Sequence, residues 1–514
     1  MKRIMPLALA ACLIIPALTL GQARDADATG PAGRRPRPAE SMPELTASEA
    51  LELMEGGVLS SEYYVAALLG RADSLAILNV FISRDSAAAL SAAREADRRR
   101  SLGLPCGRLC GLPVVVKDNI DSADLPTTAG TPALAAHRPA TNAAVLQRLL
   151  DEGAILLGKS NMHELAFGAT SNNAFFGPVR NPYDLSRTPG GSSGGTAAAV
   201  AARIAPVGLG TDTAGSVRVP AALTGTVGFR PSAGRYSRDG IVLISQTQDR
   251  TGTHARTVRD LVLLDRVLSQ AGSRVRPASL KRLRLGVDRA NFVNTADPEV
   301  VARYDAALDR LRSRGVQIVE VSVMPRAQFL GTIAALRFSV GFYEAPTNLA
   351  NYLRGVNPPL TVAQLAAQVA SPDVRQLFFG FFVPGAPFAV TPQGYQAGLE
   401  ARARLRAAYQ AVMTENALDA IVFPTTLIAA GPVGQEVVTL PGGLAVPATI
   451  AYTQNVVPAS YAGLAGLSLP VGLTSAGLPV GLEVDGLEGS DETVLGIGLS
   501  VEKALERLPP PAVP

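Results

Sequence analysis

The sequence has no tryptophan, and its 514 residues include only three histidines and three cysteines. The histidines, His137, His163 and His254, stand far apart, and none of them has the spacing of zinc ligands. This excludes a zinc site built from them, and we expect no metal centre. His163, in the segment NMHELAFG, is more typical of a packed loop residue than of a catalyst.

Charge is also sparse in this chain. Charged residues make up 18% of it, below the roughly 25% of an average soluble protein, which argues against a disordered chain. The net charge of +4 is spread without long runs of like charge, so we expect no nucleic acid partner. Lysine is much rarer than arginine: only five of the 47 lysine and arginine residues are lysines, at positions 2, 117, 159, 281 and 503.

The N-terminus has the pattern of a targeting segment. Lys2 and Arg3 precede an apolar stretch at 4–20, and the small-x-small sequence GQA follows at 21–23. This order predicts a signal peptide over residues 1–23, and the stretch is short and proline-interrupted for a transmembrane anchor. We therefore expect a periplasmic or secreted protein without a stable membrane anchor. The segment 24–43, rich in proline, arginine and alanine, is expected to be a flexible lead-in.

Cys106 and Cys110 are the two cysteines that remain after the predicted cleavage. In an oxidising compartment they could close a small loop. The sequence cannot decide whether they do, because a disulfide also requires suitable backbone geometry. Both a disulfide and a pair of free thiols in a turn stay open.

Helical and strand patterns alternate after the lead-in, which predicts an α/β architecture. The apolar run at 112–116, LPVVV, is typical of a buried strand, and Lys117 follows it directly. Residues 196–203, TAAAVAAR, predict a helix, and residues 205–209 predict the next strand. There is no internal repeat and no clear linker, so we expect one large domain.

The segment 377–388 differs in texture, because five phenylalanines stand there beside two prolines. It could belong to the core or to an interface. It could also form an apolar substrate channel or lid.

Two loops of small residues stand out. Residues 189–196, PGGSSGGT, run into the predicted helix, where backbone N–H groups suit a negative or developing negative charge. The loop lacks the lysine of a phosphate-binding loop, and its G-x-S-x-G match at Ser193 has no preceding strand, so a nucleophile elbow is not expected. The second loop, GLGTDTAGSVRVPA at 208–221, carries Ser216 behind a tight Ala-Gly turn.

Lys117 is the side chain that could activate a serine. A serine hydroxyl is a poor nucleophile unless a neighbouring group takes its proton, and lysine can take it only when neutral. Burial disfavours the ammonium form and lowers a lysine pKa, and the apolar strand before Lys117 offers that setting. Arginine could not do this, because it does not deprotonate usefully. The alternative is an ordinary ion pair between Lys117 and Asp118 or Asp121.

Four motifs occur in one order along the chain: VVVKDNID, GKSNMHELAFG, RTPGGSSGGTAAAVAA and GLGTDTAGSVRVPAAL. With them the chain resembles the amidase signature family, most of all its branch of indoleacetamide and mandelamide hydrolases, over residues 45–507. The resemblance implies an α/β fold with one large mixed β-sheet covered by helices on both sides, and an amidase domain at 44–510. It implies no cofactor.

The resemblance also implies roles for single residues. Ser216 would be the nucleophile, Ser192 a bridging serine in a cis peptide, and Lys117 the base. The oxyanion hole would be formed by the backbone N–H groups of Thr213, Ala214, Gly215 and Ser216. Ala214 departs from the family, where glycine is usual at this position.

Further residues surround this set. By resemblance, Met162 and Phe167 would line the acyl pocket. We expect Ser193 to cap the helix that follows it. We expect Asp212 and Arg218 to pair and to brace the loop that carries the nucleophile.

The resulting hypothesis is an exported amidase that converts small carboxylic amides, with an aryl or aliphatic acyl group, to acid plus ammonia or amine through an acyl-enzyme. Its partner would be a small-molecule amide, and a homodimer is left open. An amidotransferase A-like subunit would need partner proteins and transfer RNA. A non-catalytic periplasmic solute-binding protein would need none of the three catalytic side chains.

Overall fold

The computed structural model describes residues 39–269 and 273–513. The expected signal peptide and most of the expected lead-in lie outside the described residues. The first described element is the 3-10 helix η1 at Ala39–Glu44, and its Met42 is buried, so packing begins within the last residues of the expected lead-in. Among the described helices, none combines the length and the apolar character needed to cross a membrane.

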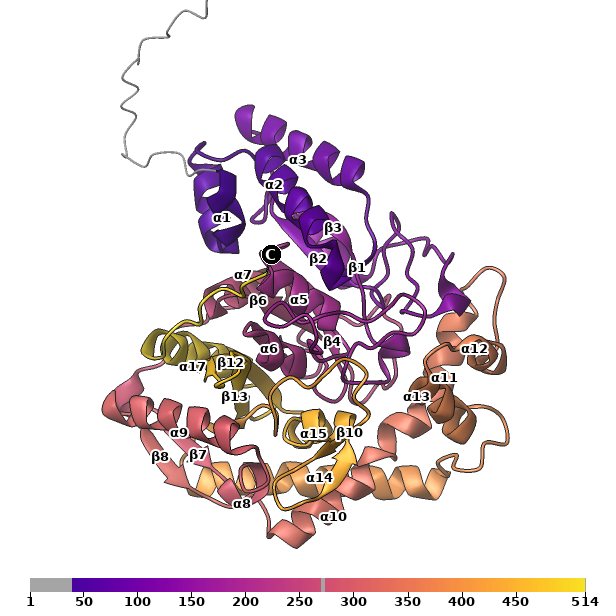
Figure 1. The fold of residues 1–514 in the computed structure, drawn as a ribbon, viewed down its shortest axis with the longest axis vertical. Coiled ribbons are helices and arrows are strands. Elements are labelled where there is room, and N and C mark those ends of the chain that lie inside the picture. Colours follow the sequence, from indigo (N-terminus) through magenta and orange to yellow (C-terminus); the bar gives the residue numbers. More distant parts are fainter. Residues whose placement is uncertain (1–38, 270–272, 514) are drawn as a thin grey trace, which may run out of the picture. The chain divides into compact units, whose positions relative to one another are not determined.

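A mixed sheet of 11 strands forms the centre of the domain, in the order β1-β3-β2-β4-β6-β5-β12-β13-β9-β7-β8 (Figure 1). Its strands are β1 (Phe81–Ser83), β2 (Pro113–Lys117), β3 (Ile155–Ser160), β4 (Val207–Asp212), β5 (Val227–Arg230), β6 (Arg250–Ala255), β7 (Arg284–Val287), β8 (Gln317–Glu320), β9 (Ala420–Pro424), β12 (Ala465–Leu473) and β13 (Pro479–Gly486). A separate two-stranded sheet pairs β10 (Val437–Thr439) with β11 (Ala445–Pro447).

The helices surround this sheet. They are α1 (Ala47–Glu55), α2 (Ser61–Ser74), α3 (Ser86–Ser101), α4 (Ala144–Asp151), α5 (Gly194–Ala201), α6 (Arg218–Thr224), α7 (Val258–Leu268), α8 (Arg289–Phe292), α9 (Pro298–Ser313), α10 (Arg326–Arg337), α11 (Val340–Leu353), α12 (Val362–Gln368), α13 (Pro372–Leu377), α14 (Pro392–Glu415), α15 (Ala448–Thr453), α16 (Val457–Ala462) and α17 (Asp491–Ala504). Shorter turns are η2 (Ala76–Leu78), η3 (Pro132–Leu134), η4 (Glu164–Ala166), η5 (Leu280–Arg282) and the π-helical η6 (Phe378–Phe382).

Strand β2 shows why both faces of the sheet are covered. Its side chains alternate between the two faces, as in any strand. Val114 and Val116 pack in one core cluster with residues of α4 and α7, whereas Val115 packs in another with residues of α2, α3 and α5. The whole strand is buried, which explains its continuous apolar run. The expected α/β fold with a large mixed sheet between helices is confirmed.

The elements that carry the site differ from the expected ranges by a few residues. The strand expected at 112–116 is β2, and Lys117 is its last residue. The helix expected at 196–203 is α5, and it begins earlier, at Gly194. The strand expected at 205–209 is β4, which continues to Asp212. β2 pairs in parallel with β3 and β4, so the carboxyl ends of all three strands meet at one edge.

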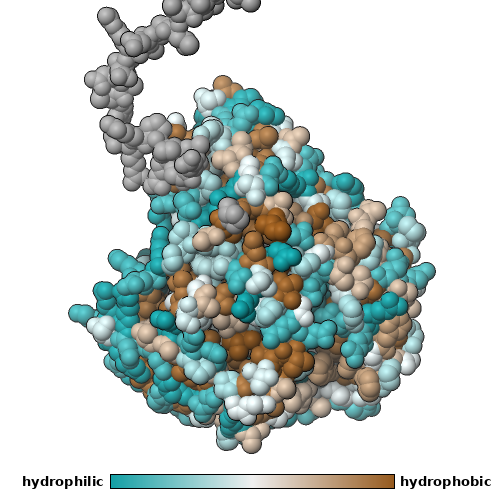
Figure 2. All heavy atoms as spheres, in the orientation of Figure 1, coloured by the Kyte–Doolittle hydropathy of each residue, from teal (hydrophilic) through white to brown (hydrophobic). Residues whose placement is uncertain are grey.

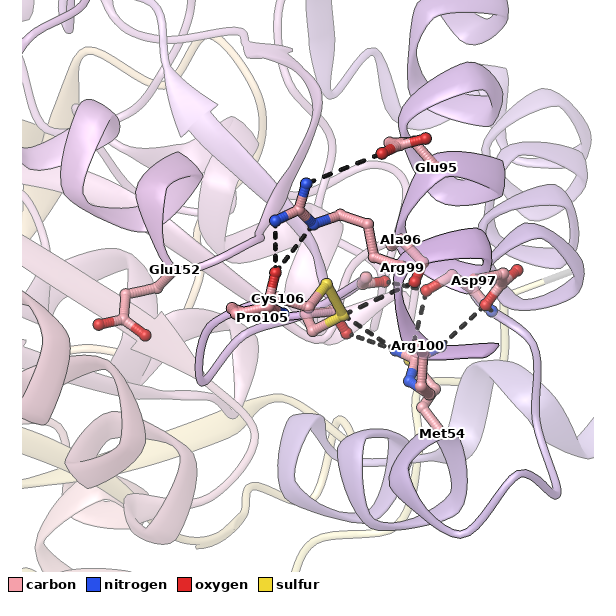
Figure 3. Close-up of a disulfide and its surroundings, with 12 residues drawn as sticks. Met54, Glu95, Ala96, Asp97, Arg99, Arg100, Pro105, Cys106 and Glu152 are labelled. Carbon is pink, nitrogen blue, oxygen red and sulfur yellow. Dashed lines mark hydrogen bonds and ion pairs between the residues drawn. A yellow bond between two sulfur atoms is a disulfide. The ribbon is translucent and has the colours of Figure 1, made fainter. Parts of the chain in front are cut away.

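The two cysteines left open by the sequence form a disulfide (Figure 3). The loop closed by Cys106 and Cys110 leads from α3 into β2. Its backbone pairs with the end of α4, because Leu109 N–H donates to the carbonyl of Glu152 at 2.8 Å. Arg100 Nη2 donates to the carbonyl of Cys110 at 2.9 Å. The cross-link therefore lies at the entry to the strand that ends at Lys117.

The phenylalanine-rich segment takes two roles. Phe378 and Phe382, in η6, are buried in a core cluster with residues of η4, α11 and α12. Phe379 and Phe388 are exposed. On the face drawn in Figure 2, apolar residues gather in separate patches within a largely hydrophilic surface. The core interpretation therefore holds for part of the segment, and its first residue, Leu377, faces the cavity described below.

Candidate active site

Lys117 stands at the centre of the site, and its side chain is completely buried. Its Nζ donates to Ser192 Oγ, in the loop before α5, at 2.7 Å. It also donates to Thr211 Oγ1, on the neighbouring strand β4, at 2.7 Å. Asn119 Nδ2 donates to the same Thr211 hydroxyl at 3.1 Å. The end of β2 thus places the amine between a hydroxyl of the adjacent parallel strand β4 and a hydroxyl of the loop before α5.

Burial lowers the pKa of Lys117 to about 7, although the carboxylates of Asp212 and Asp249 act in the opposite direction. The amine therefore changes between its charged and neutral forms near neutral pH. The alternative of an ion pair with Asp118 or Asp121 is not what the structure shows.

Each of those two carboxyls has another partner. Asp118 forms a fully buried ion pair with Lys159 at 3.1 Å and also accepts a hydrogen bond from the Thr128 hydroxyl. Asp121 accepts a hydrogen bond from the Tyr352 hydroxyl at 2.6 Å. The nearest functional groups of Lys117 are thus hydroxyls rather than an acid.

The loops that carry the two serines lie against each other. The peptide bond between Gly191 and Ser192 is cis, as expected. Ser193 N–H donates to the carbonyl of Ser216 at 3.1 Å, which holds the two loops together. Within the described residues, no hydrogen bond is formed by Ser216 Oγ, so the structure makes the contact from Lys117 to Ser192 but not a bond from Ser192 to Ser216.

Ser193 does not form the expected helix cap. It occupies the N-cap position of α5, but its side chain makes no capping bond. Its hydroxyl instead donates to the carbonyl of Thr211 at 3.2 Å and lies 3.3 Å from the Thr211 backbone N–H, which donates to it. The first N–H of the helix, that of Gly194, donates to Ser171 Oγ at 3.0 Å. Ser193 thus ties its loop to β4, and the first N–H groups of the helix have other partners, since the N–H of Gly195 donates to the carbonyl of Asn161 at 3.0 Å.

Asp212 holds the loop of Ser216 in shape. Its carboxylate accepts the N–H of Gly215 at 2.8 Å and that of Val217 at 3.2 Å. Arg218 Nε donates to Asp212 Oδ2 at 3.1 Å, so the expected pair between Asp212 and Arg218 is present. Burial opposes the charge, yet the guanidinium groups of Arg218 and Arg230 hold the pKa of Asp212 well below its usual range.

Backbone donors remain available beside Ser216. In the described part of the chain, the N–H groups of Thr213, Ala214 and Ser216 have no hydrogen-bond partner. Gly215 N–H, expected as a fourth donor, is committed to Asp212, because this buried carboxylate needs donors of its own. Gly215 has a φ of 107°, and a Cβ there would lie 2.3 Å from Val456 Cγ2, so the turn requires glycine.

A cavity of about 380 Å³ opens onto Ser216, Ala214 and Thr213. Much of its wall is apolar, with contributions from η4, α10, α11 and α16. The apolar lining includes Ala166, Phe167, Ala169, Ile244, Phe338, Phe342, Leu377, Pro447, Ile450 and Val457. The polar lining includes Gln248, Arg337, Asp373, Gln376, Thr449, Thr453 and Tyr461. The donors near Ser216 thus face a pocket that suits an apolar group.

The structure separates the two residues expected in the acyl pocket. Phe167 lines the cavity. Met162 does not, because its side chain is completely buried in the core cluster behind η4. His163 is also buried, and its Nε2 lies 3.0 Å from Asp373 Oδ2, in keeping with a packed loop residue.

Sequence reasoning missed several residues of this site. Thr211 lies in the same motif as Ser216, and the alternation of β4 could have singled out its hydroxyl next to Asp212. Phe338 lies in the junction between α10 and α11, and Phe342 lies in α11, where no motif marks a site. In the described ranges, no group of three or more His, Cys, Asp or Glu side chains is arranged to hold a metal ion.

Known proteins of similar sequence and structure were found. The Amidase family model matches residues 64–495. The chain is 40% identical over 468 residues to an indoleacetamide hydrolase of Agrobacterium vitis, covering 90% of this chain and 98% of that protein. It is 40% identical over 488 residues to a mandelamide hydrolase of Pseudomonas putida, covering 92% and 94%. The solved peptide amidase of Stenotrophomonas maltophilia aligns with a TM-score of 0.77 at 30% identity, covering 93% of this chain and 100% of that one.

We expect the Lys117 amine to titrate near pH 7 in the folded protein, because its surroundings exclude water. With only five lysines in the chain, NMR of ¹³C-labelled lysine side chains can follow each signal against pH. The signal that titrates near pH 7 should be missing in Lys117→Met. Since the unfolded chain keeps this proton up to about 10.5, the contribution of Lys117 to folding stability should rise with pH between these values. A Lys117 signal that stays charged through pH 9 would contradict this prediction.

Proposed function

The chain belongs to the Amidase family and is an amide-hydrolysing enzyme, and we propose that it works through Lys117, Ser192 and Ser216 by way of an acyl-enzyme. The observation that carries the proposal is the 2.7 Å contact between the buried Lys117 amine and Ser192 Oγ, beside a cavity that Ser216 lines. Membership in this enzyme family excludes the alternative of a non-catalytic solute-binding protein.

In the proposed first step, neutral Lys117 takes the proton of Ser192, and Ser192 takes the proton of Ser216. The Ser216 oxygen forms a bond to the amide carbonyl carbon, and the carbonyl oxygen becomes an oxyanion. The route needs a hydrogen bond from Ser216 Oγ to Ser192 Oγ, and the 3.1 Å bond from the Ser193 N–H to the Ser216 carbonyl holds the two loops against each other. A general base of this kind typically contributes a rate factor of about 10²–10⁴.

The oxyanion is stabilised by the unpaired N–H groups of Thr213, Ala214 and Ser216. Such donors act before the reaction begins, because their positions are already set, and each contributes a rate factor of about 10²–10³. The proton then returns through Ser192 to the leaving nitrogen, and the C–N bond breaks. Water, activated by the same relay, releases the acid from Ser216.

The cavity supports a substrate with an aryl or another apolar acyl group. Phe167, Phe338 and Phe342 present aromatic surface close to the Ser216 loop. The volume of about 380 Å³ lies within the usual range for small-molecule sites. The names of the two relatives, hydrolases of indoleacetamide and mandelamide, support the same choice. We therefore assign small arylacetamide-like amides to this site.

Export is part of the proposal. The basic and apolar pattern of residues 1–23 supports it. The disulfide between Cys106 and Cys110 supports it independently, because such bonds persist in oxidising compartments and are rare in the cytosol.

Replacing the proposed base tests the mechanism. Lys117→Ala should lower kcat for phenylacetamide by about 10²–10⁴-fold, and Lys281→Ala, at an exposed lysine, should leave it unchanged.

In the parent enzyme, kcat/KM should fall tenfold per pH unit well below pH 7, because protonated Lys117 cannot accept a proton. A fluorophosphonate should label Ser216 and not Ser216→Ala. Retained turnover by Lys117→Ala would refute the assignment, and turnover that requires partner proteins and transfer RNA would favour an amidotransferase subunit.

Phe167→Ala tests the acyl pocket. Loss of one buried aromatic contact should lower kcat/KM for phenylacetamide by roughly 10- to 100-fold, with a much smaller effect for propionamide. The matched control is Phe379→Ala, since Phe379 is 46% exposed and is not among the residues that line the cavity. Equal losses for both amides, or the same loss in the control, would count against an aryl-binding role.

The export proposal is tested by expressing the full chain in a bacterium with a periplasm. The protein in the osmotic-shock fraction should begin at Arg24, and its two cysteines should be unreactive toward a thiol reagent until reduced. Full-length protein with free thiols, confined to the cytoplasm, would rule the proposal out.

A further inference from the structure

Glu483 and Asp485 form a pair of buried acids beneath the catalytic loop. They stand two residues apart on β13, so their side chains point to the same face of the sheet. Both are fully buried, and both lie over Gly466 of β12. A Cβ at Gly466 would lie 2.9 Å from Asp485 Oδ1 and 2.9 Å from Glu483 Oε1, so the two carboxyls converge on one small space.

The donors around the pair are fewer than its oxygens. Arg218 Nη1 donates to Glu483 Oε1 at 2.9 Å, and it lies 3.9 Å from Asp485 Oδ1. Among the described residues, neither carboxyl oxygen of Asp485 has a hydrogen-bond partner outside the pair, and besides Arg218 and Asp485 the Thr425 hydroxyl is the further side-chain partner of Glu483. Two adjacent buried carboxylates with so few donors would be strongly disfavoured, but a proton between them turns one into a donor for the other.

The charges of the cluster agree with a single proton. The ionisable groups that face the pair come from four elements. They are Asp212 on β4, Arg218 on α6, Arg230 on β5 and Tyr409 on α14. Two guanidinium groups then face three carboxyls, and the cluster is balanced only when one carboxyl is neutral. Burial also raises the pKa of both Glu483 and Asp485 above the usual range.

We propose that Glu483 and Asp485 share one proton and that this pair, through Arg218 and Asp212, positions the loop that carries Ser216. The contacts are continuous. Glu483 holds Arg218, and Arg218 Nε lies 3.1 Å from Asp212 Oδ2. Asp212 in turn fixes the Gly215 N–H at 2.8 Å. The pair does not reach the cavity, so both acids are positioning residues.

With one shared proton the pair carries a single negative charge, which gives Arg218 a charged partner besides Asp212. If the pair lost its anion, Arg218 would retain only Asp212 as a charged partner, which Arg230 Nε also shares at 3.2 Å. If the pair lost its proton at high pH, a second buried negative charge would compete with Asp212 for Arg218. Either change would shift the donors beside Ser216 while leaving the cavity walls in place.

A double-mutant cycle tests the shared proton, with a readout in kcat that rests on the proposed function. In Asp485→Asn the anion stays on Glu483, and in Glu483→Gln it moves to Asp485, so each single variant should lose less than about threefold in kcat. The double variant has no anion and should lose about tenfold or more in kcat, with little change in KM. Loss of the shared proton should lower kcat of the parent enzyme at high pH, and this fall should be absent in Asp485→Asn.

A second measurement does not depend on activity. Difference infrared spectra should contain the carbonyl band of a buried protonated carboxyl in the parent protein. The band should vanish in both single variants and persist in Tyr409→Phe, which removes the nearby hydroxyl without touching the acids. Thermal unfolding of each variant confirms that it is folded.

Three results would overturn the proposal. One is a single variant that loses as much kcat as the double variant. Another is a double variant with parental kcat and KM. The third is the absence of the carboxyl band from the parent protein. If no variant or parent hydrolyses amides but the band behaves as expected, the proposed function fails while the shared proton stands.

Discussion

The exclusion of water from the Lys117 amine is the constraint on which the site depends. An ammonium group on that strand would be costly to bury. The hydrogen-bond partners that the fold gives the Lys117 amine are hydroxyl groups rather than a carboxylate. A close acid would keep the lysine charged, and it could then not act as the proposed base. The fold therefore pairs the neighbouring Asp118 with Lys159 and leaves Lys117 between Ser192 and Thr211.

The charged groups of the site are concentrated next to the loop of Ser216, where Asp212 pairs with Arg218 and Arg230. Asp212 shapes that loop by accepting two of its N–H groups, and Arg218 keeps Asp212 ionised. Arg218 is itself completely buried, which is tolerable only because it has several oxygen partners. A lysine whose pKa burial lowers to about 7 and a densely charged bracing cluster thus belong to the same site.

Much of this could be predicted from the sequence, because the relevant signals are local. The apolar run before Lys117 predicted a buried strand, and the glycine loop before the alanine-rich segment predicted a helix start; both are present, as β2 and α5. The pairing of Asp212 with Arg218, six residues apart, was also predicted. The errors concern contacts between distant segments. Ser193 bonds to β4 while Ser171 and the Asn161 carbonyl accept the first N–H groups of the helix, and Met162 turns into the core instead of the cavity.

The sequence alone determined which residue types stand where: one lysine after an apolar strand, two serines in loops of small residues, and two cysteines four positions apart. These depend on short-range order, which the chain carries in any conformation. Only the tertiary structure decided that the amine meets Ser192 and Thr211, that the cysteines join, and that Phe338 and Phe342 line the same cavity as Ser216. Those contacts join segments far apart in the chain or depend on one exact backbone path, and neither is encoded in a local pattern.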